Sequence, residues 1–263
     1  MKKLKQILWI VPLVVMFMAN VSWGVDVTGD FQSKAAGPNN WSAYTSWNRY
    51  NGSLWVAAVS GEVPTSTSAV TIQTGHTMNI DDGTAVCGNL SFTTTGAINF
   101  NSASSVLSVY GNATFGTAKT NISAWTSGAK LVFTGTATQT WTTGTDSRFD
   151  AIEINKSSGT LTQSTGSSIR IGSSLTVTGG GTFALGSGTD IEGVQFANGT
   201  TATFLTITVS VGSTFNMDAG AASYIRSGIS GTAAIGSVTV YGTMNLSTTS
   251  GTGLQFGAVT VGD

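Results

Sequence analysis

Charged side chains are scarce in this sequence. Asp, Glu, Lys and Arg make up only 9% of the residues, against a usual share of about 25% in soluble domains, and the formal net charge is −1. No run of lysine or arginine is present, so the chain lacks the positive surface that binds nucleic acid or an anionic membrane. We therefore expect neither nucleic acid nor, for the mature chain, a membrane as partner.

Residues suited to catalysis or metal binding are equally few. The single cysteine, Cys87, cannot form an internal disulfide, and we interpret it as a small core residue. The single histidine, His76, has no second His or Cys at ligand spacing, which argues against a zinc site. Nucleophile-elbow, phosphate-loop and dinucleotide motifs are also missing. The sequence thus predicts no catalytic residue, no metal and no cofactor.

The N-terminus has the pattern of a secretory signal peptide. A lysine-containing start, residues 1–5, precedes an apolar stretch, residues 7–19, and the small residues Ser22 and Gly24. The apolar stretch is short for a membrane span, which needs about 20 residues. We expect cleavage after Gly24, with an uncleaved anchor as the alternative, so the remaining 263 − 24 = 239 residues leave the cytoplasm. The predicted location is secreted or at the cell surface.

The mature chain carries strand periodicity and no helical stripe. Apolar residues alternate with Thr, Ser or Asn, and Gly, Ser, Asn or Thr separate the runs. Because hydrophobic residues reach 40%, such strands can bury a core. The predicted strands include Val70–Ile72, Leu90–Phe92, Ile98–Phe100, Leu107–Val109, Leu131–Phe133, Ile152–Ile154, Leu175–Val177, Leu205–Ile207, Val238–Val240 and Met244–Leu246.

A strand, a glycine turn and a second strand also recur along the chain. The turn glycines fall at positions 111, 179, 212 and 242, so the first interval is much longer than the two that follow. An imperfect repeat of this kind predicts a solenoid whose coils carry insertions. We expect an all-β fold, a right-handed parallel β-helix with an aromatic N-terminal cap. An antiparallel β-sandwich stays as the alternative, although its Asn-Gly and Asp-Gly hairpin signals are limited to residues 51–52, 82–83 and 198–199.

Carboxylates offer weak candidates for glycoside chemistry. Asp190 and Glu192 share a strand face at i, i+2, and Asp146 lies near Asp150, yet such spacings arise by chance and favour solvated surface groups. Asp81-Asp82 is interpreted as a turn rather than a calcium site. The arginines are interpreted as isolated side chains that no site brings together: Arg148, Arg170 and Arg226.

Aromatic residues cluster between residues 41 and 55, and two interpretations stay open. The rings could form a surface on which sugars stack, or a lid over the apolar end of the first coil, which we favour. The candidate ligand-binding residues are Trp41, Tyr44, Trp47 and Trp55.

Threonines at alternate positions from 134 to 142 are similar to the threonine rows of ice-binding faces. They alternate within one predicted strand, however, whereas an ice-binding face needs equivalent threonines from coil to coil. This row therefore argues against ice binding.

Several motifs resemble the opening of secreted bacterial surface proteins that contain an eight-glycine-type β-helical region. The likeness covers about residues 38–180, and Ser68-Ala69 departs from it where that family often has Gly-Asp. The matching segments are Asn40–Ser42, Thr45–Trp47, Trp55, Val63–Ser66, Val70–Ile72, Thr74–Ile80, Asn89–Phe92 and Phe149–Gly159. Because members of that family are usually longer and end in a sorting or anchoring domain, the resemblance implies that this chain is a fragment.

Composition and resemblance together lead to two expectations of function. The first is an extracellular or cell-surface structural or adhesive module without catalysis, with surface glycans or other surface proteins as partners. The second is a polysaccharide lyase or glycoside hydrolase on a β-helix scaffold, which rests on analogy between folds. The expected organisation is a signal peptide (1–24), an aromatic N-terminal cap (25–69) and a β-helical repeat domain (70–263).

Overall fold

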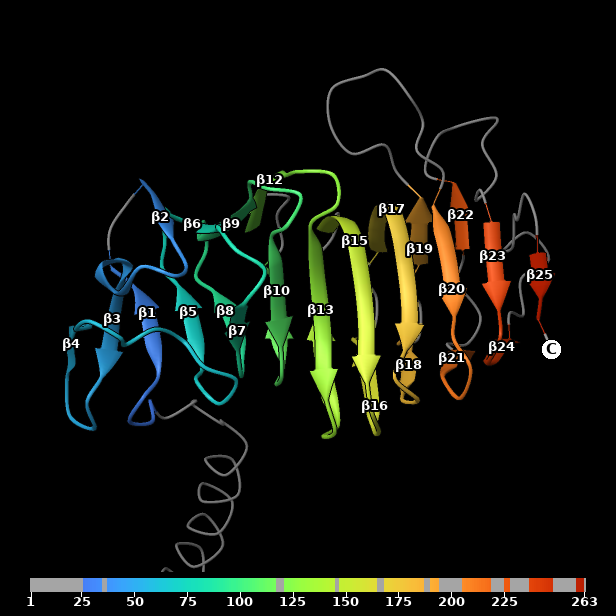
Figure 1. Ribbon diagram of the computed structural model, residues 1–263, viewed down its shortest axis with the longest axis horizontal. Helices are drawn as coiled ribbons and strands as arrows, with labels where there is room; N and C mark the ends of the chain where they lie inside the picture. The colour runs from blue at the N-terminus through green and yellow to red at the C-terminus, as the bar shows by residue number, and fades with distance from the viewer. Residues whose placement is uncertain are drawn as a thin grey trace, which may run out of the picture.

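The structure is a computed structural model that describes residues 26–34, 37–116, 121–144, 147–164, 168–186, 190–193, 205–218, 225–227, 237–247 and 259–262. The expected signal peptide lies outside these ranges. Strands lie across the long axis of an elongated all-β body (Figure 1). Helical structure within the described ranges is short: it comprises the 3-10 turn η1 (Tyr44–Ser46) and Asn121, which is also in 3-10 conformation. No helix of these residues is long and apolar enough to cross a membrane.

Three sheets make up this body. The first contains, in spatial order, β24 (Thr243–Ser247), β21 (Thr214–Asp218), β18 (Thr182–Ala184), β16 (Thr160–Gln163), β14 (Gln139–Thr142), β11 (Ala113–Thr114), β8 (Leu90–Phe92), β5 (Val70–Ile72), β1 (Phe31–Ser33), β3 (Trp47–Tyr50) and β4 (Trp55–Ala57). The second contains β25 (Val259–Val261), β23 (Ser237–Val240), β20 (Thr206–Val209), β17 (Ser168–Thr178), β15 (Ser147–Lys156), β13 (Lys130–Gly135), β10 (Val106–Val109) and β7 (Ala85–Cys87), with β19 (Asp190–Gly193) and β22 (Ile225–Ser227) off the main path. The third contains β12 (Ile122–Trp125), β9 (Ala97–Phe100), β6 (His76–Ile80) and β2 (Gly37–Asn40).

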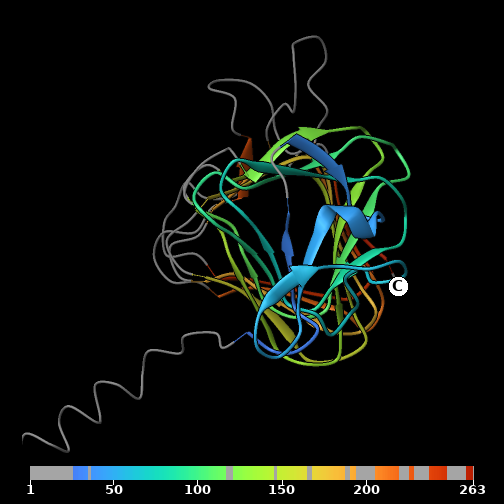
Figure 2. The same ribbon diagram turned by 90° about the vertical axis from the view of Figure 1, so that its left-hand side faces the viewer.

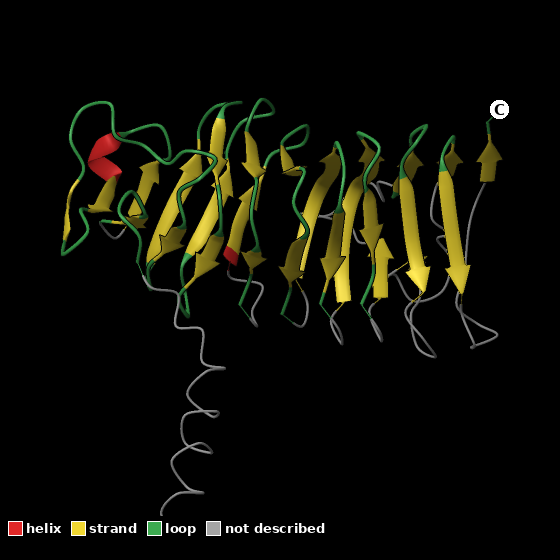
Figure 3. Cartoon of the chain, turned by 90° about the horizontal axis from the view of Figure 1, so that it is seen from below, coloured by secondary structure: helices red, strands yellow, loops and turns green. Residues whose placement is uncertain are grey.

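From β5 onward the chain returns repeatedly to the first sheet. Up to β14 it passes through the third and then the second sheet before each return, and after β14 the described strands between returns belong to the second sheet. We call the passage from one return to the next a circuit. The register pairs Val70 with Leu90 and Leu90 with Ala113, so the chain returns to the same place in the first sheet once per circuit. Successive circuits follow one another along the long axis (Figure 3), and the sheets surround one interior when the body is viewed from its end (Figure 2).

Strand alternation divides inward from outward side chains. In β17, for example, Leu175 and Val177 are fully buried, whereas Thr176 between them is partly exposed. The interior continues as aromatic contacts from circuit to circuit, such as the stacked rings of Phe183 and Phe215 at 5.4 Å. Such pairs add to the free energy gained by removing apolar area from water. Cys87 is fully buried in this core.

One buried cation interrupts the apolar interior. Lys156 is fully buried, and its ammonium group donates hydrogen bonds to Ala137 O at 2.6 Å and Gln139 Oε1 at 2.7 Å. Burial lowers the pKa of this lysine. In the next circuit the chain turns at Gly179, close to the backbone of Lys156. There φ is +82°, and an added Cβ would lie 2.6 Å from Lys156 O. Glycine is therefore required at this turn, because a side chain would both clash and strain the backbone.

The alternative of an antiparallel sandwich is wrong. Among the described pairings only β1–β3 and β3–β4 are antiparallel, and all others are parallel. The one antiparallel hairpin, β3–β4, turns at an Asn-Gly signal: Gly52 has φ +97°, and Asn51 Oδ1 accepts hydrogen bonds from Ser53 N and Leu54 N. The second signal, at residues 82–83, joins β6 to β7, and the third lies outside the described residues.

Parallel pairing begins earlier than the expected domain boundary. Strand β1 pairs in parallel with β5, and β2 pairs in parallel with β6. Both lie in the segment that the sequence assigns to the cap, residues 25–69. The part that stands apart from the parallel circuits is the segment from η1 to residue 69, which contains the β3–β4 hairpin.

Candidate functional site

Two of the four predicted ligand-binding aromatics lie inside the core. Trp41 is 2% exposed and Trp47 is 0% exposed, and their rings meet edge to face at 5.0 Å. The indole N–H of Trp47 donates to Trp41 O at 2.9 Å, and the ring also meets Phe31 of the first circuit edge to face at 6.2 Å. Because buried rings offer no face to a sugar, Trp41 and Trp47 do not fit a stacking surface in this structure.

The other two predicted aromatics keep contact with solvent. Tyr44 in η1 is 39% exposed, and Trp55 at the start of β4 is partly exposed and packs on Tyr50 at 5.4 Å between ring centroids. Both belong to the segment that lies across the N-terminal end of the body (Figure 2). The structure thus separates the cluster into two buried rings and two that a ligand could reach.

An open pocket of about 780 Å³ lies beside this segment. Its walls come from residues 26–31, from Arg49 in β3, from the loop 61–69, and from the outward faces of β5 and β8. Its volume lies within the range of small-molecule sites, roughly 300–1,000 Å³. Hydroxyl and amide groups dominate the lining: Thr28, Thr65, Thr67, Ser68, Thr71, Asn89 and Ser91.

Three of the four charged residues that line this pocket have partners within the protein. Arg49 Nη1 pairs with Glu62 Oε1 at 2.9 Å, and Glu62 Oε2 accepts the backbone N–H of Val59 at 2.9 Å. The carboxylate of Asp30 accepts the backbone N–H groups of Val27 and Ala69. Carboxylates held in this way are positioned for structure rather than for proton transfer. The pocket is therefore suited to hydrogen bonding of a polar ligand.

Other residues considered in the sequence have structural contacts. Asp82 accepts hydrogen bonds from Thr84 N and Oγ1, which is the expected turn role, whereas Asp81 accepts them from Ser42 N and Oγ and thereby joins two distant segments. His76 Nδ1 lies 2.7 Å from the hydroxyl of Ser33. Within the described ranges no group of three His, Cys, Asp or Glu side chains could hold a metal ion.

Asp150 is a buried acid at an irregular point of β15, where the register with β17 shifts. Burial raises the pKa of its carboxyl, and a hydrogen bond from Ser173 partly opposes this shift. One oxygen, Oδ2, has no hydrogen-bond partner among the described residues. Asp146, its suggested partner, lies outside those residues.

The interpretation of three arginines as isolated needs correction. The register aligns Arg148 with Arg170, Arg170 with Glu192, and Glu192 with Arg226. Both neighbours of Arg170 in β17 are buried, so Arg170 lies on the outward side of its strand. Asp190, the other carboxylate considered, lies two residues before Glu192 in β19 and pairs with Ser168 of β17. Sequence reasoning missed this alignment because the four positions are far apart along the chain and the last interval is longer than the two before it.

Rows of hydroxyl side chains on the second sheet are the feature that the sequence analysis missed. The register places Thr176, Thr208, Thr239 and Thr260 side by side on four successive strands. A second row two residues earlier contains Ser174, Thr206 and Ser237. We call these residues the hydroxyl face: Ser174, Thr176, Thr206, Thr208, Ser237, Thr239 and Thr260.

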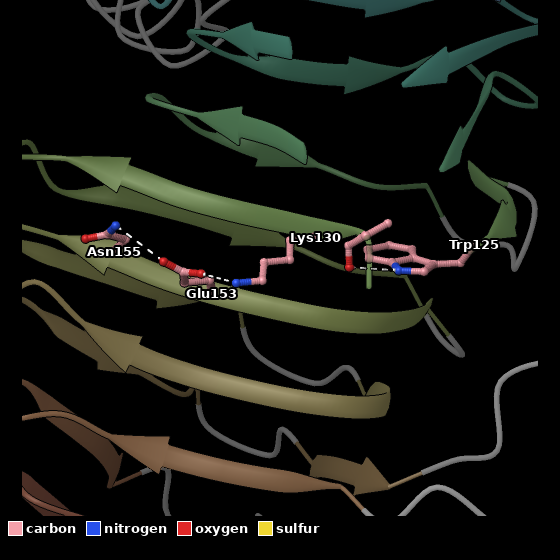
Figure 4. Close-up of polar contacts among 5 residues, drawn as sticks. Trp125, Lys130, Glu153 and Asn155 are labelled. Atoms are coloured by element: carbon pink, nitrogen blue, oxygen red, sulfur yellow. Dashed lines mark hydrogen bonds and ion pairs between the residues drawn. The ribbon is translucent and has the colours of Figure 1, made fainter. Parts of the chain in front are cut away.

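Charged groups border the hydroxyl face toward the N-terminus. Glu153 precedes Thr176 in the same row, and it accepts hydrogen bonds from Lys130 Nζ at 3.0 Å and Asn155 Nδ2 at 3.3 Å (Figure 4). Beside them the indole of Trp125 donates to the backbone of Ala129 at 3.2 Å (Figure 4). The row that contains Glu153 continues from Thr176 toward the C-terminus without a further charged residue.

No family model, curated protein or solved structure was found that matches the chain.

Proposed function

We propose that the protein is a right-handed parallel β-helix that acts outside the cell as an adhesive or structural module without catalysis. The repeated return of the chain to the first sheet, in parallel register, supports a helical course, and the strong preference of parallel crossovers for one hand supports right-handedness. The signal-like residues 1–24 and the resemblance to secreted bacterial surface proteins support export.

The polar pocket at the N-terminal end carries the adhesive part of this proposal. Its hydroxyl and amide lining can exchange hydrogen bonds with the hydroxyl groups of a glycan, while Tyr44 and Trp55 offer partly exposed rings in the neighbouring segment. The ion pair of Arg49 with Glu62 leaves Asp26 and Asp30 as the unbalanced charges of the lining, so the pocket favours a neutral sugar over an acidic one. Surface glycans are thus the proposed partners.

A pair of double variants tests this assignment. Thr71 and Ser91 are register partners that line the pocket, and their hydroxyls lie 2.9 Å apart. Thr140 and Thr162 are register partners in the same sheet but outside the pocket lining. We expect Thr71→Ile/Ser91→Ile to lose retention on immobilised bacterial or host polysaccharides that bind the protein, and Thr140→Ile/Thr162→Ile to keep it. Equal retention by both double variants would place the glycan elsewhere and refute the pocket.

A polysaccharide-degrading enzyme is the second candidate, and one observation favours it. The register sets Glu192 between Arg170 and Arg226, a carboxylate between two cations, which is a combination that could bind and act on an acidic sugar. The pocket is lined by residues of β3, β5 and β8, and these strands lie well apart from β19 and β22 along the body (Figure 1). Turnover of acidic polysaccharides that disappears in Glu192→Gln would establish this second function over the first.

A further inference from the structure

The hydroxyl face repeats regularly in two directions. Neighbouring strands of a sheet lie about 4.8 Å apart, and residues i and i+2 of one strand lie about 6.6 Å apart. The in-register rows therefore present hydroxyl groups on a nearly rectangular grid of these spacings across β17, β20, β23 and β25. Between the two rows the side chains point inward and are buried. The grid is thus fixed by the stacking of circuits.

The central hydroxyls are available to a partner. In the part of the chain that the structure describes, the side chains of Thr176, Thr208 and Thr239 have no hydrogen bond to another residue, and all three are partly exposed. Ser237 Oγ and Thr206 Oγ1 share one long contact of 3.5 Å. By contrast, outward hydroxyls of earlier circuits pair with each other, as in Thr71 with Ser91 at 2.9 Å.

Threonine makes this grid rigid. A β-branched side chain has restricted rotation about χ1, and each strand of the grid is paired on the sheet, so few degrees of freedom remain to be lost on binding. Each threonine also adds a methyl group beside its hydroxyl. The grid is rigid and uncharged, and it offers hydrogen-bond donors, acceptors and methyl groups. It therefore complements an ordered partner better than it complements a flexible partner.

From this geometry we propose that the hydroxyl face binds the surface of ice. The partner must repeat in two directions with spacings near those of the grid and must both donate and accept hydrogen bonds at every point. Water molecules on an ice surface meet both conditions. An ice-binding face needs equivalent threonines from coil to coil. The register provides them on four successive strands as Thr176, Thr208, Thr239 and Thr260. Sugar chains fit less well, because the face has no aromatic ring on which they could stack.

The threonines considered in the sequence do not form this face. The segment 134–142 belongs to two strands, because Thr134 lies near the end of β13 in the second sheet and Thr140 and Thr142 lie in β14 of the first sheet. Gly135, the last residue of β13, has φ +95°, and residues 136–138 separate the two strands. The ice-binding assignment therefore rests on other residues, and it is independent of the glycan pocket.

The test introduces lysine in place of an outward threonine, once on the hydroxyl face and once on the first sheet. Thr208 lies at the centre of the hydroxyl face, and Thr162 is an equivalent outward threonine of the first sheet whose next register partner is Ala184. The measurements are the gap between the melting and freezing points of a single ice crystal, the shape of that crystal, and the growth of grains in polycrystalline ice. We expect the protein to shape crystals and open a gap, Thr208→Lys to lose both effects, and Thr162→Lys to retain them.

Several outcomes would overturn the proposal. They are the absence of any effect of the protein on ice, an equal loss in both variants, and retained activity in Thr208→Lys. Thermal unfolding checks that each variant is folded, and if Thr208→Lys is not, Thr239→Lys makes the same change on the next strand of the face. Binding to a crystalline polysaccharide that Thr208→Lys abolishes, without any effect on ice, would also refute it and would assign the face to sugars.

Discussion

Truncation of Trp47 to alanine should loosen one end of the molecule and leave the other intact. The side chain is fully buried, meets Phe31 and Trp41 edge to face, and donates its indole hydrogen to Trp41 O. Removing a buried tryptophan costs about 3–5 kcal/mol, of which each edge-to-face contact represents roughly 0.5–1.5 kcal/mol. Because each circuit contacts only its neighbours, the loss should stay local.

Hydrogen exchange resolved along the chain measures this local effect. We expect amides of β1, β5 and β6 to lose protection in Trp47→Ala, while amides of β20 and β23 keep it. Trp55→Ala is the matched control, since that ring is partly exposed and should cost less. A cost below about 1 kcal/mol, or an equal loss of protection from β1 to β23, would refute the view that Trp47 seals the first circuit.

Three further predictions concern buried polar groups. Burial raises the pKa of Cys87, so iodoacetamide should modify this thiol only after unfolding, and rapid alkylation of the folded protein would contradict its core position. Because the pKa of Asp150 is raised in the folded state, its contribution to stability is complete below the unfolded value of about 3.9 and is lost as the pH rises through the folded value. Urea unfolding at several pH values should therefore show a smaller loss of stability toward neutral pH for Asp150→Asn, and parallel profiles would refute the assignment. Lys156→Met leaves the carbonyl oxygens of Gly135 and Ala137 without their donor and should cost roughly 1–3 kcal/mol per unsatisfied group, whereas an unchanged unfolding midpoint would contradict this.

Alternation of apolar and polar residues located ten of the strands. Each of the ten predicted segments falls within a strand, except that Leu205 lies one residue before β20. Alternation works here because one face of each strand is buried and the other is polar. Turn glycines indicated the circuits less well. The long interval between Gly111 and Gly179 spans three circuits, whose intermediate turns contain Gly135 and Gly159.

The hydroxyl face escaped detection for a different reason. Its threonines recur at unequal intervals along the chain, so no constant period relates Thr176, Thr208, Thr239 and Thr260. A short motif does relate them, because residues 174–177, 206–209, 237–240 and 258–261 read SLTV, TITV, SVTV and AVTV. Side-by-side placement depends on how long each intervening loop is and where the chain re-enters the sheet, which local sequence does not specify. The buried Lys156 has no sequence signal at all, since charged residues are rarely fully buried.

Distances between spin labels test the stacking of circuits most directly. Ser108 and Thr208 are four register steps apart on the second sheet, through Val132, Glu153 and Thr176, and Thr260 is two steps further. At about 4.8 Å per step, the backbone separations are about 19 Å and about 29 Å. In a Cys87→Ala background, pulsed EPR on Ser108→Cys/Thr208→Cys and Ser108→Cys/Thr260→Cys should give distances that differ by about 10 Å. Equal distances, or a shorter distance to position 260, would contradict parallel stacking of the circuits and with it the hydroxyl face.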